Sequence, residues 1–416
     1  MTAPMTLGID FGTSNSAAGV AAGGRPWLIE LEPGEQTLPT AVFFDPDSGK
    51  MRIGRSATRA LISGDEGRFM RALKSLLGTP LLHEERRLGG QRMTLSAVVT
   101  QFLAEVKARA EAQTHMKFTH ALSGRPVRFH SRDEARNAQA EDDLRACYLA
   151  AGFQDVRFML EPEAALRATE ARSGLGLIVD IGGGTSDFTA FRQDADGTTD
   201  ILASYGIRLG GTDFDQKISL ARVMPLLGRG SSIRNSFGSG TLPAPNRIYN
   251  DLSSWQMIPF LYTPEHRRAA RDLQQQASEP DRLARLVSTL EDELGHDIAF
   301  AVERGKIAAN QPQEVGAQID LKVLERGLQA SLSGDDISAL LEAQMQELAE
   351  AAAETLKLAG TAPEEVNRIV LVGGSALLGC LQQEIQRLCP KAGVENRHAL
   401  TAVADGLAIA AAEAFA

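Results

Sequence analysis

The chain has 416 residues, which is enough for two or three domains. Its 43 Lys and Arg residues against 53 Asp and Glu residues give a net charge of −10, which argues against nucleic acid as a partner because a phosphate backbone attracts a basic surface. Its 43% hydrophobic and 23% charged residues exclude general disorder, and its 3 cysteines are too few for a disulfide framework.

The N-terminal part of the chain predicts strands alternating with helices. Apolar periodicity predicts a helix that includes residues 95–106, and a second helix is expected at 132–152. Short apolar or β-branched runs bounded by turn residues predict the strands. These lie at residues 7–12, 16–24, 25–31, 41–45, 120–124 and 156–160.

The remainder continues this alternation around a largely helical segment. We expect a strand, turn and strand over 176–191, a strand at 200–209, and further strands within 314–328 and at 368–375. Helices are predicted at 279–309 as one long helix, then at 334–360, 376–388 and 402–415. A Gly/Ser/Pro-rich loop is expected at 228–246. The alternation indicates an α/β protein.

Two segments resemble each other and indicate an internal duplication. LGIDFGTSNS begins at residue 7 and LIVDIGGGTSDF at residue 177. Each has an aliphatic strand with one aspartate, a glycine turn with hydroxyls, and a second strand. Two such units facing each other would form two related lobes with a cleft between them.

The two turns have the composition of phosphate-binding loops. Glycine permits close approach of a ligand, and turn amides with hydroxyl groups donate hydrogen bonds to anions. Because the aspartates repel phosphate, they are compatible with a phosphate ligand only if a cation lies between the two. Hydrated Mg²⁺ suits this position, since it binds one or two carboxylates together with phosphate oxygens. A single turn of this composition is equally compatible with a plain β-hairpin that binds no ligand. The chain has no GxxxxGK[ST] run, so a Walker-type loop is excluded.

Six segments in order resemble one protein family. They are GIDFGTSNS, LEPEAAL, VDIGGGTSDF, RLGGTDFD, ERGKIA and IVLVGGS. The series resembles the nucleotide-binding domain of DnaK-type Hsp70 chaperones, and the short length is similar to YegD-type members. The resemblance implies an actin-like ATPase fold, in which two lobes, each built on a ribonuclease H-like mixed sheet, enclose a central cleft for ATP or ADP with Mg²⁺.

The resemblance also implies a division of the chain. Lobe I would comprise residues 1–174, completed by the terminal helix at 400–416. Lobe II would comprise residues 175–399, with a mostly helical subdomain at about 211–325.

The resemblance assigns the phosphate and metal side of the site. It implies that Asp10 and Asp180 hold Mg²⁺ through water, and that Lys74, Glu161, Asp187 and Thr185 act in hydrolysis. Taken alone, Lys74 also fits a solvated helix lysine and Glu161 a helix-start acid favoured by the helix dipole. Pro126 matches a proline thought to couple the lobes, although any turn explains it. The phosphate-loop residues implied are Gly12, Thr13, Ser14, Asn15, Gly182, Gly183, Gly184, Gly210 and Gly211.

The nucleoside side follows from the same resemblance. Glu303 and Lys306 match a ribose-binding pair, although such a pair also fits an exposed helix ion pair. Gly373, Gly374 and Ser375 match an adenosine-binding turn, which also fits an ordinary strand-to-helix connection, and Asn310 and Leu377 complete the candidate residues. In the family two arginines sandwich adenine, whereas Ile307 and Leu377 stand at those positions here. Each lost cation–π contact is worth ~0.5–2 kcal/mol.

The leading prediction is Mg²⁺-dependent ATP binding with slow hydrolysis in a chaperone-like protein. Since the printed sequence ends at the terminal helix, we expect no peptide-binding domain. The alternatives are a nucleotide-controlled binding module with negligible hydrolysis, an actin-like filament protein, or a small-molecule kinase. With no long apolar run and no signal-peptide pattern, we expect a cytoplasmic monomer that contacts nucleotide and an unknown protein partner, but neither nucleic acid nor membrane.

Overall fold

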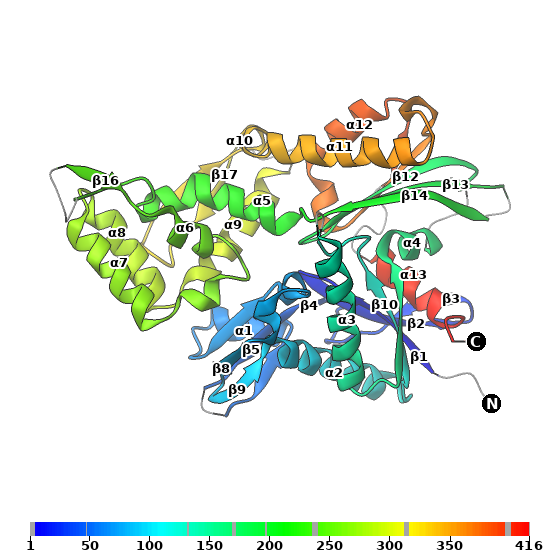
Figure 1. Ribbon diagram of the computed structural model, residues 1–416, viewed down its shortest axis with the longest axis horizontal. Helices are drawn as coiled ribbons and strands as arrows, with labels where there is room; N and C mark the ends of the chain where they lie inside the picture. Colours follow the sequence, from blue (N-terminus) through cyan, green and yellow to red (C-terminus); the bar gives the residue numbers. More distant parts are fainter. Residues whose placement is uncertain are drawn as a thin grey trace. The chain divides into compact units, whose positions relative to one another are not determined.

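The structure is a computed structural model that describes residues 5–46, 48–130, 133–168, 172–195, 198–234, 240–311, 316–395 and 401–415. Its chain divides into two units, which are described separately below (Figure 1). Unit 1 combines Met1–Gly211 with Met345–Ala416, and unit 2 is Thr212–Gln344.

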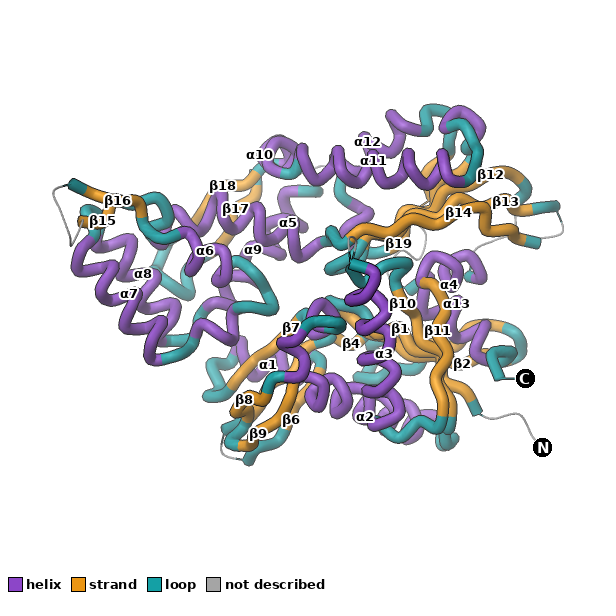
Figure 2. Tube along the Cα trace, viewed as in Figure 1, coloured by secondary structure: helices purple, strands orange, loops and turns teal. Residues whose placement is uncertain are grey.

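The first sheet of unit 1 contains the N-terminal hairpin (Figure 2). Its main strand order is β11-β10-β1-β2-β3, in which β1 is antiparallel to β2 and parallel to β10. The short β4 also pairs with β2. The strands are β1 (Thr6–Phe11), β2 (Asn15–Ala22), β3 (Arg25–Leu28), β4 (Leu38–Pro39), β10 (His120–Arg125) and β11 (Asp155–Leu160).

The second sheet of unit 1 repeats this arrangement. Its order is β14-β13-β12-β19-β20, with β12 antiparallel to β13 and parallel to β19. Each of the strands β1 and β12 therefore has one antiparallel and one parallel neighbour. This confirms that the two similar sequence segments form equivalent hairpins. The strands are β12 (Gly174–Ile181), β13 (Ser186–Gln193), β14 (Thr199–Ile207), β19 (Arg368–Val372) and β20 (Gly393–Glu395).

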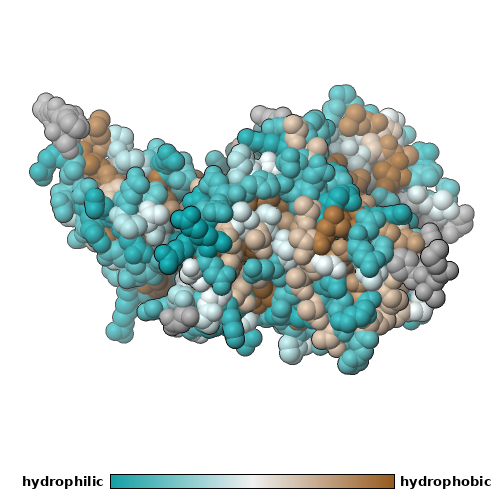
Figure 3. Space-filling view, turned by 60° about the horizontal axis from the view of Figure 1, so that its bottom comes forward, coloured by the Kyte–Doolittle hydropathy of each residue, from teal (hydrophilic) through white to brown (hydrophobic). Residues whose placement is uncertain are grey.

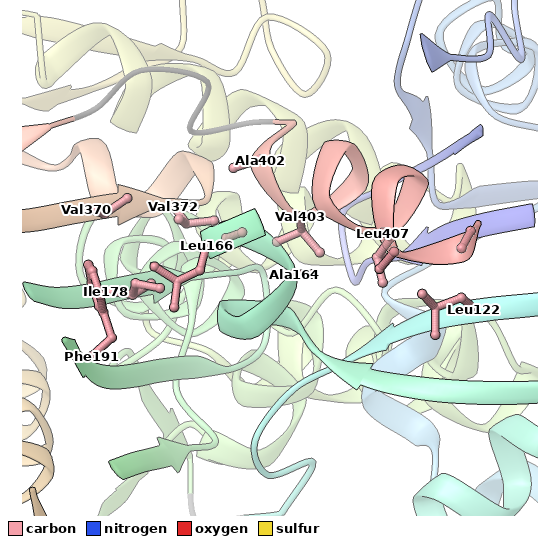
Figure 4. Close-up of a cluster of buried hydrophobic side chains, with 13 residues drawn as sticks. Leu122, Ala164, Leu166, Ile178, Phe191, Val370, Val372, Ala402, Val403 and Leu407 are labelled. Carbon is pink, nitrogen blue, oxygen red and sulfur yellow. The ribbon is translucent and has the colours of Figure 1, made fainter. Parts of the chain in front are cut away.

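Two helices join these sheets through a shared core. Side chains of α4 (Glu161–Arg167) and α13 (Ala402–Ala411) pack against Leu122 of the first sheet and Ile178 and Val370 of the second (Figure 4). The helices approach so closely that a β-carbon added to Gly406 of α13 would overlap the carbonyl oxygen of Ala164 in α4. Helix α13 thus packs on the strand that contains Asp10 and on the helix that begins with Glu161.

The other elements of unit 1 surround these sheets. Helix α2 contains the residues predicted to be helical, and it begins after Thr94, whose Oγ1 accepts a hydrogen bond from the backbone N–H of Ala97 at 3.1 Å. The predicted helix at 334–360 is interrupted at Leu341, where α10 ends and α11 follows. The elements are β5 (Ala41–Phe44), β6 (Met51–Ile53), α1 (Arg55–Ile62), β7 (Arg68–Arg71), η1 (Leu73–Leu76), η2 (Pro80–His83), β8 (Glu85–Leu88), β9 (Gln91–Thr94), α2 (Leu95–Thr114), α3 (Glu134–Ala150), α11 (Glu342–Leu358), η6 (Pro363–Glu365), η7 (Gly374–Leu377) and α12 (Gly379–Leu388).

Unit 2 is mostly helical, as the sequence predicts, with two small antiparallel ribbons, β15–β16 and β17–β18. Of the expected strands within 314–328, residues 314 and 315 lie outside the described residues, and β18 begins only at Gln329. The elements are α5 (Gly211–Ile218), η3 (Ser219–Val223), η4 (Met224–Leu227), β15 (Ser232–Arg234), β16 (Thr241–Pro243), α6 (Asn246–Leu252), η5 (Ile258–Leu261), α7 (Pro264–Gln276), α8 (Pro280–Glu291), α9 (Gly295–Ala309), β17 (Ala317–Asp320), β18 (Gln329–Leu332) and α10 (Gly334–Leu340).

Two predictions for unit 2 were wrong. The single helix expected at 279–309 is two helices, because Glu293 adopts a left-handed φ of 56°. Tyr262 fixes this break, since its hydroxyl donates to the carbonyl of Glu293 at 2.9 Å and accepts from the N–H of Gly295 at 3.0 Å. The loop expected at 228–246 contains the β15–β16 ribbon, and its residues 235–239 lie outside the described residues.

Hydrophilic side chains predominate on the face drawn in Figure 3, where hydrophobic residues form separate patches. Within the described part of the chain, no helix is both long enough and apolar enough to span a bilayer.

Candidate functional site

The two predicted phosphate loops face each other within unit 1. A β-carbon added to Gly183 would lie 2.5 Å from the Oγ of Ser14 and 3.0 Å from the Cβ of Thr13. The second loop is a tight turn, because the N–H of Gly182 donates to the carbonyl of Thr185 at 2.9 Å. The prediction that both hairpins converge is therefore confirmed, and glycine at position 183 keeps the space between them open.

The other two glycine turns flank the second loop. The N–H of Gly211 donates to the carbonyl of Gly182 at 3.0 Å, and a β-carbon added to Gly210 would lie 2.7 Å from the backbone of Gly183. Gly373 has a φ of +80°, and a β-carbon there would lie 3.2 Å from Oδ1 of Asp180. The side chain of Ser375 also lies against Gly211. Backbone from four separate segments thus meets around the ends of β1 and β12.

Buried and partly buried carboxylates lie close together in this site. Burial is the largest cause that raises the pKa of Asp10, to about 7, and the charge of Glu161 adds to it. Burial also raises the pKa of Asp180 well above its ordinary value, and the charges of Glu161, Asp187 and Asp10 act in the same direction. These mutual repulsions show that side chains distant in sequence share one small, poorly solvated region.

Lys74 supplies positive charge to this region. Its Nζ lies 2.6 Å from Oε1 of Glu161, and the Lys74 side chain is only 6% exposed. Burial alone would lower the pKa of Lys74, but the charges of Glu161 and Asp10 outweigh it and raise the pKa. The reading of Lys74 as a solvated helix lysine was wrong. Ala72, two residues before Lys74, has a left-handed φ of 61°, a strained conformation of the kind found at functional sites.

Asp187 is held at the edge of the same cluster. Its Oδ1 accepts a hydrogen bond from the N–H of Val127 at 2.8 Å, directly after Pro126. Burial raises the pKa of Asp187 well above its ordinary value, and Glu161 is the next cause. The segment that follows β10 therefore orients the carboxylate of Asp187, which lies on β13 of the second sheet.

Several polar groups of the site have no hydrogen-bond partner among the described residues. Oδ2 of Asp180 is buried and accepts no hydrogen bond from the described residues. The described residues also offer no hydrogen bond to the hydroxyls of Thr13, Ser14 and Thr185. Asn15, at the start of β2, is exposed. Donors and carboxylates left unsatisfied together indicate a ligand with anionic and cationic parts.

The donor set fits Mg²⁺ rather than a metal held by protein alone. Asp10, Asp180, Asp187 and Glu161 provide four carboxylates against the one ammonium of Lys74, and a divalent cation would offset this excess. Within the ranges that the structure describes, no group of three or more His, Cys, Asp or Glu side chains could hold a metal ion. A hydrated Mg²⁺ that is shared with phosphate oxygens needs only one or two carboxylates.

The predicted ribose-binding residues Glu303 and Lys306 lie on α9 in unit 2, and Asn310 caps its C-terminus. The Nζ of Lys306 lies 2.6 Å from Oδ1 of Asp215, and both side chains are nearly fully buried. The Nε1 of Trp255 donates to the other oxygen of Asp215 at 3.1 Å. The alternative of an exposed Glu303–Lys306 ion pair is therefore wrong, since Lys306 pairs with Asp215 in the interior.

The positions that replace the arginine pair differ in exposure. Ile307 on α9 of unit 2 is 56% exposed. Leu377 ends η7 in unit 1 and is partly buried. Gly374 and Ser375 begin the same short helix, which is the strand-to-helix connection that the sequence suggested as one reading.

Sequence reasoning missed two residues. Ser75, next to Lys74, has its Oγ 3.1 Å from the position of a β-carbon added to Gly184, so it lies against the second loop. Its only sequence signal is adjacency to Lys74. Asp215 belongs to the motif RLGGTDFD, but nothing in that motif identifies Lys306 as its partner 91 residues later.

The arrangement defines a class of protein in which two related hairpins bring glycine turns and carboxylates together. The sequence model for Hsp70 protein matches residues 6–223 and 290–413, which is most of the chain. This chain belongs to the Hsp70 family, and its fold is the actin-like ATPase fold of that family.

A named relative supports this membership. The chaperone protein DnaK of Endomicrobium trichonymphae is 34% identical to this chain over 221 residues. The match covers 51% of this chain but only 34% of that DnaK, so the chain matches about a third of the length of this relative.

Proposed function

We propose that this protein binds ATP and ADP through their phosphates between the β1–β2 and β12–β13 turns, together with Mg²⁺. The observation that carries this proposal is the approach of Gly183 to Thr13 and Ser14. There, hydroxyls that form no hydrogen bond with the described residues border buried carboxylates. A triphosphate tail satisfies the donors, and the cation offsets the carboxylates. A single hairpin would not provide both the hydrogen-bond donors for phosphate and the pair of carboxylates for a cation.

Asp10 and Asp180 are the residues that would hold Mg²⁺, through its bound water. When bound, the cation neutralises charge on the phosphates and so assists attack on phosphorus. The protein residues bind and orient: Thr13, Ser14 and Thr185 donate to phosphate oxygens, and the glycines Gly12, Gly182, Gly183, Gly184, Gly210 and Gly211 leave room for the ligand. These roles remain proposals that rest on geometry and charge.

We further propose slow hydrolysis by water at the terminal phosphate. Lys74 supplies positive charge beside the terminal phosphate, and Glu161 holds the Lys74 ammonium at 2.6 Å. Asp187 is oriented by Val127 and accepts a hydrogen bond from the attacking water. Catalysis of this type is positioning plus electrostatic stabilisation, so it requires no covalent intermediate on the protein.

The finer predictions from sequence stand as proposals. Contacts of Glu303, Lys306, Asn310, Gly373, Gly374, Ser375 and Leu377 with the nucleoside remain predictions. A chaperone-like role, an unidentified protein partner, a monomeric state and a cytoplasmic location are likewise proposed. Because the match spans about a third of the named relative's length, client binding by the whole relative is not carried over to this chain.

Calorimetry with ATP, ADP and GTP, each with and without Mg²⁺, tests the proposal. We expect Mg²⁺-dependent binding of ATP and ADP, and loss of the Mg²⁺ dependence in Asp10→Asn and Asp180→Asn variants. Failure to bind any of the three nucleotides would contradict the proposal. Phosphate release by the isolated protein then separates an ATPase from a nucleotide-controlled binding module, which would show binding without turnover.

A further inference from the structure

We propose that the Ser75 hydroxyl is an additional ligand of the terminal phosphate and helps the site to distinguish ATP from ADP. This inference rests on the proposed function, because it assumes that phosphates occupy the space between the two hairpins. It adds a contact from a further segment that borders this space, the 3₁₀ helix η1.

The position of Ser75 is defined by its distance from the second loop. A β-carbon added to Gly184 would lie 3.1 Å from the Oγ of Ser75 and 3.2 Å from the Oγ1 of Thr13. Hydroxyls of two separate segments therefore converge on one point above the Gly182–Gly184 turn. Any residue with a side chain at position 184 would fill that point, which explains the glycine there.

The hydroxyl has no structural task that would explain this position. Ser75 is partly buried, and its hydroxyl forms no hydrogen bond with any other residue in the described ranges. Its backbone N–H donates to the carbonyl of Ala72 at 3.1 Å, so the turn is closed without the side chain. Thr79 is the opposite case, because its Oγ1 donates to the carbonyl of Leu76 at 2.7 Å and stabilises the same loop.

The chemistry of η1 suits an anion. Ser75 follows Lys74, whose ammonium already lies 2.6 Å from Glu161 and so shares its charge with a carboxylate. A neutral hydroxyl adds a directional donor without further charge. Loss of one hydrogen bond to a charged group reduces affinity roughly tenfold or more. Since Lys74 is the residue proposed at the terminal phosphate, its neighbour would act on ATP rather than on ADP.

Calorimetry with Mg²⁺–ATP and Mg²⁺–ADP on the full chain tests this inference. In Ser75→Ala we expect affinity for ATP to fall roughly tenfold, because one charge-assisted hydrogen bond is lost, and affinity for ADP to change less than about twofold. Ser75→Thr, which keeps the hydroxyl, should retain most of the ATP affinity. Thr79→Val is the matched control, since it removes a hydroxyl that holds the loop but does not approach Gly184.

The outcomes separate this inference from the proposed function. If the unmodified chain binds neither nucleotide, both are overturned. If it binds ATP and Ser75→Ala binds ATP equally well, or loses ATP and ADP affinity equally, only the role of Ser75 is overturned. The same holds if Thr79→Val reproduces the selective loss, because the effect would then come from the loop. Should Ser75→Ala fail to fold, Ser75→Cys, a weaker donor of similar size, provides the comparison.

Discussion

Asp187 lies directly opposite Asp180 in the β12–β13 hairpin, whereas the residue opposite Asp10 in the equivalent β1–β2 hairpin is Ala17. The two hairpins share topology and one aspartate each, but the second carries an additional buried carboxylate. This carboxylate receives the N–H of Val127 from the segment after β10. The duplication thus places one aspartate at the same position in each hairpin, and its asymmetry adds a third carboxylate, Asp187, on β13.

The buried carboxylates should make the site unfavourable for folding when no cation is bound. Asp180→Asn removes a buried carboxyl group whose ionisation is opposed by burial and by neighbouring carboxylates, which raise its pKa, and whose Oδ2 has no hydrogen-bond partner among the described residues. We expect the free energy of unfolding without metal to rise by about 1–2 kcal/mol, because an uncompensated buried charge is destabilising. Urea unfolding with and without Mg²⁺ and ATP measures this. A lower free energy of unfolding for Asp180→Asn in the absence of metal would contradict the view that the crowded carboxylates destabilise the fold.

Lys74 should matter for turnover more than for binding. Lys74→Ala is expected to slow ATP hydrolysis by about 100-fold while nucleotide still binds, which is the scale of losing one preorganised electrostatic group. Steady-state phosphate release and calorimetry measure the two quantities. Because the substitution leaves Glu161 buried without its ammonium, the double variant with Glu161→Gln serves as a stability control. Unchanged turnover in Lys74→Ala would remove the residue from the mechanism.

The contact between α4 and α13 should tolerate no added atom. In Gly406→Ala the new methyl group would overlap the carbonyl of Ala164, so one helix must move. We expect a loss of about 3 kcal/mol or more in the free energy of unfolding, measured by urea denaturation. Gly393→Ala is the matched control, since the nearest atom to its β-carbon is 3.9 Å away. Equal stability of the two variants would show that the helices adjust freely.

The Asp215–Lys306 pair should be essential to the stability of unit 2. Asp215→Ala leaves the Lys306 ammonium in the interior, where its side chain is 9% exposed, and should cost about 3–5 kcal/mol of unfolding free energy. Adding Lys306→Met should restore much of the loss. Asp320→Ala, which breaks an exposed pair with Lys322, should cost less than about 1 kcal/mol. Similar losses in both single variants would contradict the special role of the buried pair.

Glu111 should contribute stability that depends on pH. Burial alone would raise the pKa of Glu111, but hydrogen bonds from Lys107, Lys117 and the N–H of Phe118 lower it from 4.5 to about 2. A lowered pKa in the folded state means that the stabilisation is complete above pH 4.5 and is lost as the pH falls toward 2.

Glu111→Gln therefore should be less stable than the unmodified chain at pH 7, with a difference that shrinks below about pH 4.5. Urea unfolding across this range measures it. Glu105→Gln, on the same helix but in an exposed pair with Arg109, should show little change at either pH. A constant difference for Glu111→Gln down to pH 3 would contradict the prediction.

Local sequence was sufficient for the hairpins and for the α/β class. An aspartate, glycine and hydroxyl turn between apolar strands specifies its own geometry, because the preferences involved act over a few residues. The same argument predicted α2, whose apolar residues recur at helical spacing and whose first turn is capped by Thr94.

Tertiary structure alone decided which side chains meet. Lys74 and Glu161 are 87 residues apart, and their contact depends on how η1 and α4 pack around the first sheet. The break between α8 and α9 at Glu293 likewise depends on the hydroxyl of Tyr262, whereas the helical periodicity of 279–309 continues through it. Periodicity reports which face of a segment is buried, but partners in a folded core are chosen by packing between distant segments. For that reason the two glycine turns were predictable from sequence, whereas the positions of Ser75 beside Gly184 and of Asp215 beside Lys306 became visible only in the fold.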